Sequence, residues 1–132
     1  MYDIENDVII HDHFIKDSEV PLYFGAADLV VQPYKSATQS GVTQIAFHYE
    51  KPMLVTDVGG LREIVNDRVC GYVVQPQPEE IAEAIIDYFD NNREKQFTAG
   101  VRREKEKFSW DKMTASIIEV YKNCLAAGEK IF

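Results

Sequence analysis

The sequence has few cysteines, no long apolar run and no surplus of basic charge, and each shortage excludes a class of protein. Its 132 residues include only two cysteines, Cys70 and Cys124, whose separation matches no metal-binding or redox motif. We therefore expect two reduced thiols in a cytoplasmic protein. No run reaches the roughly 18 apolar residues of a membrane span. The first residues lack the basic start and apolar core of a signal peptide.

The balance of charge argues against nucleic acids as partners. The chain has 22 acidic and 14 basic residues, which gives a net charge of −8. A negative overall field opposes binding to DNA, RNA or an anionic membrane surface. Hydrophobic residues make up 45% of the chain, which is typical of a folded globular protein of single-domain length.

Short apolar runs alternate with helical patterns along the chain. The apolar runs predict about four strands, at residues 7–11, 28–33, 52–56 and 71–76. Apolar residues at helical spacing, together with a charged helical stretch, predict helices at residues 17–27, 40–50, 61–65, 78–91, 92–107 and 109–128. Strands that alternate with helices indicate an α/β fold, a Rossmann-like doubly wound parallel sheet followed by C-terminal helices.

The last predicted helix carries an apolar face. Its members are Met113, Ile117, Val120, Tyr121 and Cys124. We expect Trp110 to be a packing anchor for this helix.

Two loops of small and polar residues follow neighbouring predicted strands, and each leads into a helix. In an open parallel sheet, ligands bind outside the carboxyl ends of the strands, and the N-terminus of a helix suits a phosphate. Three hydroxyl side chains and two glycines that leave room for a ligand lie in these loops: Ser36, Thr38, Ser40, Gly59 and Gly60. The loops predict a phosphate or nucleotide site, although ordinary caps and turns have a similar composition.

Several segments resemble one protein family. The stretches "YFGAADLVVQPY", "EKPMLVTDVGGLREIVNDRVCGYVVQP" and "FSWDKMTASIIEVY" are similar, in this order, to the C-terminal nucleotide-sugar-binding domain of the retaining GT-B glycosyltransferases of group 1, also called family 4. The resemblance covers residues 8–122.

The resemblance implies a function and a set of contacts. It implies the nucleotide-sugar-binding part of an enzyme that transfers a sugar, with retention, from a nucleotide-diphosphate donor to a saccharide or lipid-linked acceptor, without a metal or other cofactor. The implied contacts to the donor diphosphate and sugar are Ser36, Thr38, Gln39, Ser40, Gly41, Val42, Thr43, Gly59 and Gly60. The implied contacts to the ribose or base are Gln44, His13 and Phe14.

The sequence departs from the family pattern in two ways. The family often has two glutamates, one for the donor sugar and one for the ribose. A gapless match puts Ala37 and Ile45 at these places, and a shift by one residue offers Thr38 and Gln44 or Ala46 instead. The N-terminal domain and the first strands of the C-terminal domain, with a basic pair that neutralises the leaving diphosphate, are also expected to be missing. We therefore expect residues 1–132 to form one partial domain with no catalytic residue and no activity alone.

The expected truncation predicts an open sheet edge, and open apolar edges invite pairing. We expect residues 7–11 to pair beside the strand at 28–33 or to reach a second molecule. The predicted partners are thus a nucleotide sugar, the missing N-terminal domain and another copy of the chain. Two other interpretations stay open: a free-standing Rossmann-like module for nucleotide binding or protein docking, and part of a sugar-nucleotide epimerase of the same architecture.

Overall fold

A three-stranded parallel sheet organises the computed structural model, which describes residues 4–128. The strands are β1 (Val30–Gln32), β2 (Met53–Thr56) and β3 (Gly71–Val74), in the order β1-β2-β3. All four residues of the central strand β2 are buried, as expected for a parallel strand that is covered on both faces.

The helices follow the predicted order, with bounds that are often narrower than predicted. They are α1 (Val20–Ala26), α2 (Gly41–His48), α3 (Leu61–Ile64), α4 (Pro78–Asp90), α5 (Glu94–Lys105), the 3-10 turn η1 (Glu106–Phe108) and α6 (Trp110–Gly128). None of the helices within residues 4–128 has the length and apolar content needed to cross a membrane. Cys70 and Cys124 are both free thiols.

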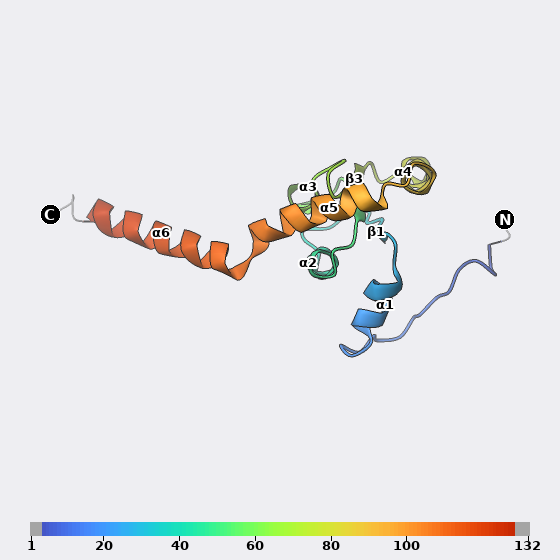
Figure 1. Cartoon of the computed structure of the whole chain (residues 1–132), viewed down its shortest axis with the longest axis horizontal. Coiled ribbons are helices and arrows are strands. Elements are labelled where there is room, and N and C mark those ends of the chain that lie inside the picture. Colours follow the sequence, from blue (N-terminus) through green and yellow to red (C-terminus); the bar gives the residue numbers. More distant parts are fainter. Residues whose placement is uncertain (1–3, 129–132) are drawn as a thin grey trace.

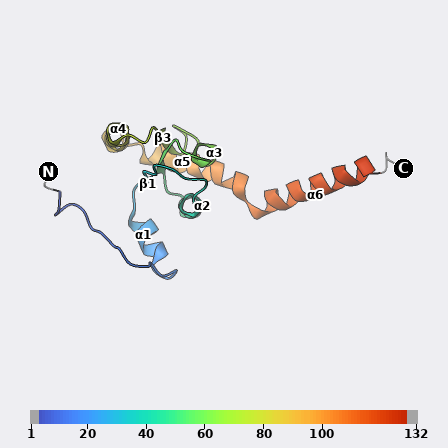
Figure 2. The same ribbon diagram turned by 180° about the vertical axis from the view of Figure 1, so that it is seen from behind.

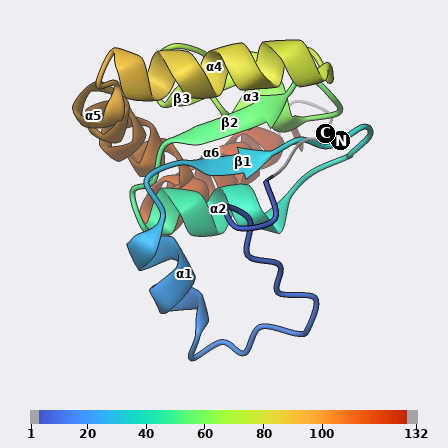
Figure 3. The same ribbon diagram turned by 90° about the vertical axis from the view of Figure 1, so that its right-hand side faces the viewer.

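Helices cover both faces of the sheet, which confirms the doubly wound Rossmann-like arrangement. Figure 3 shows α2 and α4 on opposite sides of the strands. On one face, buried side chains of α2, α3 and α5 pack against β2; the set includes Ala46, Phe47, Leu61, Val101, Met53 and Val55. On the other face, α4 and the start of α5 pack against β2 and β3 through Leu54, Tyr72, Ala84, Tyr88 and Phe97.

The predicted strand at residues 7–11 is wrong. This segment is extended but has no strand partner among the described residues, and Ile9 and Ile10 are 83% and 80% exposed. Figures 1 and 2 show it leading away from the sheet beyond α1. An apolar run indicates a strand only where a neighbour supplies hydrogen bonds and packing, and β1 pairs with β2 alone. Pairing beside β1 is therefore wrong, whereas contact with a second molecule stays a prediction.

The expected packing of the last helix is also wrong. Every residue from 110 to 126 is exposed, and Trp110 itself is 78% exposed. Helix α6 extends from the end of η1 as an arm (Figure 1). The Ser109 hydroxyl accepts the Lys112 N–H at 3.3 Å and starts the helix. The apolar face is present as predicted, but no other described element lies against it.

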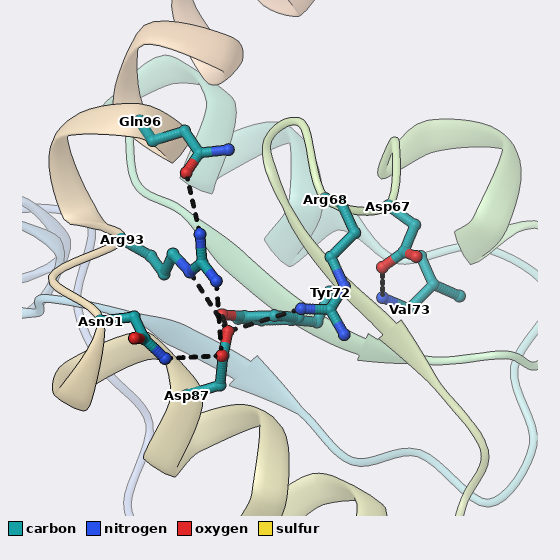
Figure 4. Close-up of polar contacts among 8 residues, drawn as sticks. All are labelled: Asp67, Arg68, Tyr72, Val73, Asp87, Asn91, Arg93 and Gln96. Atoms are coloured by element: carbon teal, nitrogen blue, oxygen red, sulfur yellow. Dashed lines mark hydrogen bonds and ion pairs between the residues drawn. The ribbon is translucent and has the colours of Figure 1, made fainter.

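A carboxylate joins β3, α4 and α5 near the amino end of β3 (Figure 4). Asp87 of α4 accepts hydrogen bonds from the Tyr72 hydroxyl at 2.5 Å, from the Asn91 amide at 2.8 Å and from Arg93 Nε at 3.3 Å. The hydrogen bonds from Tyr72 and Arg93 lower the pKa of Asp87. Burial, and then the bond to Asp87, raise the pKa of Tyr72 to about 12. These hydrogen bonds connect α4 and α5 to β3. The cluster lies away from the two predicted loops.

Candidate functional site

The two loops singled out by the sequence emerge at the same edge of the sheet. Residues 33–40 connect β1 to α2, and residues 57–60 connect β2 to α3. Because β1 and β2 are adjacent and parallel, both loops leave from carboxyl ends, where open α/β sheets bind their ligands. Figure 3 shows both strands ending on the side where α2 begins.

Hydrogen bonds join the two loops to each other. The Thr56 hydroxyl at the end of β2 donates to the Tyr34 carbonyl oxygen at 2.6 Å. The Gly60 N–H donates to the Thr38 carbonyl oxygen at 2.9 Å. Thr56 is fully buried, so its hydroxyl makes this hydrogen bond in place of one to water. The loop after β1 is therefore held across the end of β2.

The two glycines serve this contact between loops. Gly59 has a φ of 55°, and a Cβ at Gly59 would lie 1.8 Å from the Ala37 carbonyl oxygen. A Cβ at Gly60 would lie 3.0 Å from the Thr38 carbonyl oxygen. The space beside each glycine, where a side chain would lie, is filled by the neighbouring backbone. The prediction that these glycines leave this space for a ligand is therefore wrong. Ligand contact by Gly59 and Gly60 stays a prediction.

Helix α2 begins without a side-chain cap. Ser40 has the extended backbone of an N-cap residue, with φ −137° and ψ 122°, but its side chain makes no capping hydrogen bond. Its hydroxyl donates instead to Gln32 Oε1 at 2.6 Å. The first N–H groups of a helix have no acceptor within the helix. Those of Gly41, Val42 and Thr43 are thus left for a ligand or water.

The predicted donor-binding residues differ in what they can offer. Ser36, Thr38 and Gln39 are exposed on the loop, and Gly41 is exposed with open space around it. Thr43 is fully buried, and its hydroxyl donates to the Ser40 carbonyl oxygen at 2.5 Å. For Thr43, and for Val42 whose side chain is apolar, only the backbone N–H remains as a donor.

The charges around this helix start suit an anion. The first turn of α2 contains no acidic residue, and Lys35 is exposed on the loop before it. Asp57, on the second loop, is paired with Arg62 at 3.0 Å, so its charge is partly compensated. The partial positive charge of the α2 N-terminus is therefore not cancelled by a carboxylate in its own first turn.

The predicted ribose and base contacts are not brought together. Gln44 lies on the exposed side of α2, where a hollow of about 410 Å³ separates α2 from α1. His13 lies near His11, with 5.6 Å between the ring centroids, and Phe14 is 83% exposed. Figures 1 and 2 show their segment beyond α1 as seen from the sheet. The roles of Gln44, His13 and Phe14 stay predictions.

One residue of the site was missed by sequence reasoning. Gln32 is 3% exposed and lies at the carboxyl end of β1, with its amide against Ser40. The sequence pattern indicates only that Gln32 belongs to the predicted strand at 28–33. The signal was a polar side chain at the end of an apolar run, where a buried polar group needs a partner. Within residues 4–128, no three His, Cys, Asp or Glu side chains gather to hold a metal ion.

Comparison with known proteins assigns the chain to a family. The family described as "Glycosyl transferases group 1" matches residues 2–91, which is more than half of the chain. The chain belongs to the group 1 glycosyltransferases. This confirms the resemblance that the loop and strand motifs indicated.

Curated relatives of the chain are much longer than it is. A D-inositol 3-phosphate glycosyltransferase of Paenarthrobacter aurescens is 27% identical over 122 residues, which are 91% of this chain and 30% of the relative. An uncharacterized glycosyltransferase of Methanocaldococcus jannaschii is 31% identical over 106 residues, which are 78% of this chain and 30% of the relative. The chain therefore spans about three tenths of the length of these proteins.

Solved structures share the fold. A sucrose-phosphate synthase from Thermosynechococcus elongatus matches with a TM-score of 0.71 at 23% identity, over 86% of this chain and 29% of that protein. A glycosyltransferase from Rickettsia africae matches with a TM-score of 0.68 at 23% identity, over 85% of this chain and 31% of that protein. At this identity the likeness establishes the fold, which agrees with a GT-B Rossmann-like domain.

Proposed function

We propose that this chain is the donor-binding part of a glycosyltransferase that uses a nucleotide-diphosphate sugar and retains the anomeric configuration. The diphosphate would bind at the start of α2, against the backbone N–H groups of Gly41, Val42 and Thr43. The exposed side chains of Ser36, Thr38 and Gln39 would reach the diphosphate and the sugar. The acceptor would be a saccharide or a lipid-linked compound.

The observation that carries this proposal is the uncapped start of α2 at the carboxyl edge of the sheet. The helix offers free N–H groups and a partial positive charge, and Ser40, which could cap it, bonds to Gln32 instead. The family membership of residues 2–91 supports a nucleotide sugar as the ligand of this proposed anion site. Curated relatives are named D-inositol 3-phosphate glycosyltransferase, which makes a polyol phosphate one acceptor to test.

We expect the chain to be inactive by itself. Departure of a nucleoside diphosphate needs positive charge placed against it in the transition state. Lys35 is the one basic residue in the two loops, and it is exposed. Groups that complete the leaving-group site and select the acceptor would then come from polypeptide that this chain does not include.

A free-standing nucleotide-binding module is the second candidate. Ala37 and Ile45 stand where the family pattern has glutamates, and their side chains cannot accept a hydroxyl hydrogen bond. A module would bind a nucleoside diphosphate and its sugar derivative equally. A donor-binding domain would bind the sugar derivative more tightly, because the loop side chains also contact the sugar.

The proposal is tested by titration with UDP, GDP and ADP and with their glucose derivatives, followed by amide NMR shifts. We expect shifts at residues 36–43 and 57–60. Gly41→Pro removes one free N–H, fits the first turn of a helix, and follows a residue whose extended backbone accepts proline. It should weaken binding about tenfold, the effect of one hydrogen bond to a charged group.

Gly41→Ala is the matched control for this experiment. A Cβ at Gly41 meets nothing within 4 Å, and alanine keeps the N–H, so binding should match that of the unchanged chain. Equal weakening by alanine and proline would show that the N–H is not the contact. No shift at millimolar nucleotide would contradict the proposed donor site.

A further inference from the structure

Ser40 has everything an N-cap needs except the capping bond. Serine is among the best N-cap residues, and its oxygen normally accepts the N–H of the second or third helical residue. Its backbone here is extended, as a cap requires, yet no side-chain cap is formed. A neighbouring group must therefore hold the hydroxyl in another direction.

That group is the side chain of Gln32. Gln32 Oε1 accepts the Ser40 hydroxyl at 2.6 Å in a buried contact between the end of β1 and the start of α2. Gln32 is 3% exposed and Ser40 is 9% exposed. With little water available as a competing partner, this hydrogen bond fixes the direction of the Ser40 side chain.

A second observation at the same place points to a ligand. The other amide atom, Gln32 Nε2, is buried and has no hydrogen-bond partner among the described residues. A buried amide donor without an acceptor is unfavourable. An anion oxygen that reaches the first turn of α2 would be an acceptor of the right kind for this donor.

We infer that Gln32 is a positioning residue that keeps the anion site at the start of α2 open. It holds the Ser40 hydroxyl away from the N–H groups of Val42 and Thr43, which would otherwise be capped, and its own unpartnered amide donor is part of the same side chain. The ligand class is a diphosphate. This inference rests on the proposed function, because that function identifies the anion.

The test compares four forms of the full chain: unchanged, Gln32→Met, Ser40→Ala, and the double variant. Methionine keeps the length and approximate volume of glutamine without its polar atoms. The probe is inorganic pyrophosphate, with amide NMR shifts as the readout of affinity and amide exchange as the readout of capping. The same spectra report whether each variant is folded.

Opposite effects are expected from the two single changes. Gln32→Met frees the Ser40 hydroxyl to cap the helix, so the Thr43 N–H should exchange more slowly without ligand. Pyrophosphate affinity should fall about threefold to thirtyfold, the range of an N-cap contribution. Ser40→Ala should bind pyrophosphate more tightly than Gln32→Met does, because without a serine hydroxyl no cap can form. In the unchanged chain, the side-chain amide resonances of Gln32 should shift with pyrophosphate.

The double variant decides between positioning and a merely structural role. Without a serine hydroxyl no cap can form, so Ser40→Ala should restore most of the affinity that Gln32→Met loses. If the double variant binds as weakly as Gln32→Met, or if Gln32→Met leaves affinity and Thr43 exchange unchanged, the inference is overturned while the donor site stands. If Gln32→Met does not fold, the inference is overturned when pyrophosphate leaves the side-chain amide resonances of Gln32 in the unchanged chain unmoved. Absence of pyrophosphate binding by the unchanged chain overturns both proposals.

Discussion

At the scale of single residues, close backbone contact explains more of the site than side-chain chemistry does. Gly59 combines a positive φ with direct contact to the Ala37 carbonyl oxygen. An L-residue is strained in that conformation, and a Cβ would overlap the neighbouring loop. A side chain at position 59 would therefore displace the loop after β1 from its place.

We predict that Gly59→Ala destabilises the fold by at least about 2 kcal/mol, through backbone strain and the overlap with Ala37. Gly25→Ala is the matched control, because Gly25 lies in α1 and its Cβ would meet nothing within 4 Å. That change should stabilise by about 0.5–1 kcal/mol. Urea denaturation measures both. Equal effects would contradict the assigned loop contact.

At the scale of elements, Asp87 connects β3, α4 and α5. Its carboxylate accepts from Tyr72, Arg93 and Asn91 (Figure 4). A second ion cluster joins the turn after α2 to α5, where Glu50 pairs with Arg102 at 2.6 Å and Lys105 at 3.1 Å. The first cluster connects α4 and α5 to β3, the second connects α5 to the turn after α2, and neither includes a residue of the loops at the carboxyl end of the sheet.

The lowered pKa of Asp87 makes this contribution depend on pH. A carboxyl whose pKa is lower in the folded state stabilises above its unfolded pKa, near about 4, and loses this contribution as pH falls through the folded value. Asp87→Asn should therefore be less stable than the unchanged chain at pH 7, with a gap that narrows below pH 4. Denaturation midpoints across pH measure the gap. The control is Asp90→Asn, an exposed change in α4, whose stability should differ little from that of the unchanged chain at any pH. A difference for Asp87→Asn that does not change with pH would contradict the prediction.

At the scale of the whole molecule, α6 is an arm rather than a part of the core. Its residues from 110 to 126 are exposed, including Ile117 at 60% and Tyr121 at 63%, and Figures 1 and 2 show it leading away from the sheet. A helix without tertiary packing is marginal in water. The sheet and the helices packed on its two faces therefore contribute most of the free energy of unfolding.

We predict that truncation after Ser109 leaves the free energy of unfolding within about 0.5 kcal/mol, as for changes away from packed sites. In thermal unfolding followed by far-UV circular dichroism, the truncated chain should no longer show a gradual loss of helical signal below the main transition. The cooperative main transition should remain. Phe97→Ala, in the buried part of α5, should lower stability by about 3–5 kcal/mol. A truncated chain that melts several degrees lower would show that α6 packs on the body in solution.

Local pattern was sufficient for the strands at 28–33, 52–56 and 71–76 and for the order of the helices, because each has its own periodicity and its own breaks. The same reasoning was wrong for residues 7–11 and for Trp110. An apolar run predicted a paired strand at 7–11, and a large aromatic side chain predicted a packed anchor at 110. Burial depends on a second surface, and a single sequence segment does not reveal whether that surface is there.

The fold class, the family and the two loops after β1 and β2 could be predicted from the sequence alone, since these depend on residue types at fixed local spacing. The contacts of the loop residues became known only with the folded structure. Gly59 touches the Ala37 carbonyl, Thr43 is buried, and Gln32 turns Ser40 away from the start of α2. Each of these facts is a contact between segments that the parallel sheet brings together, and that proximity is a property of the folded chain.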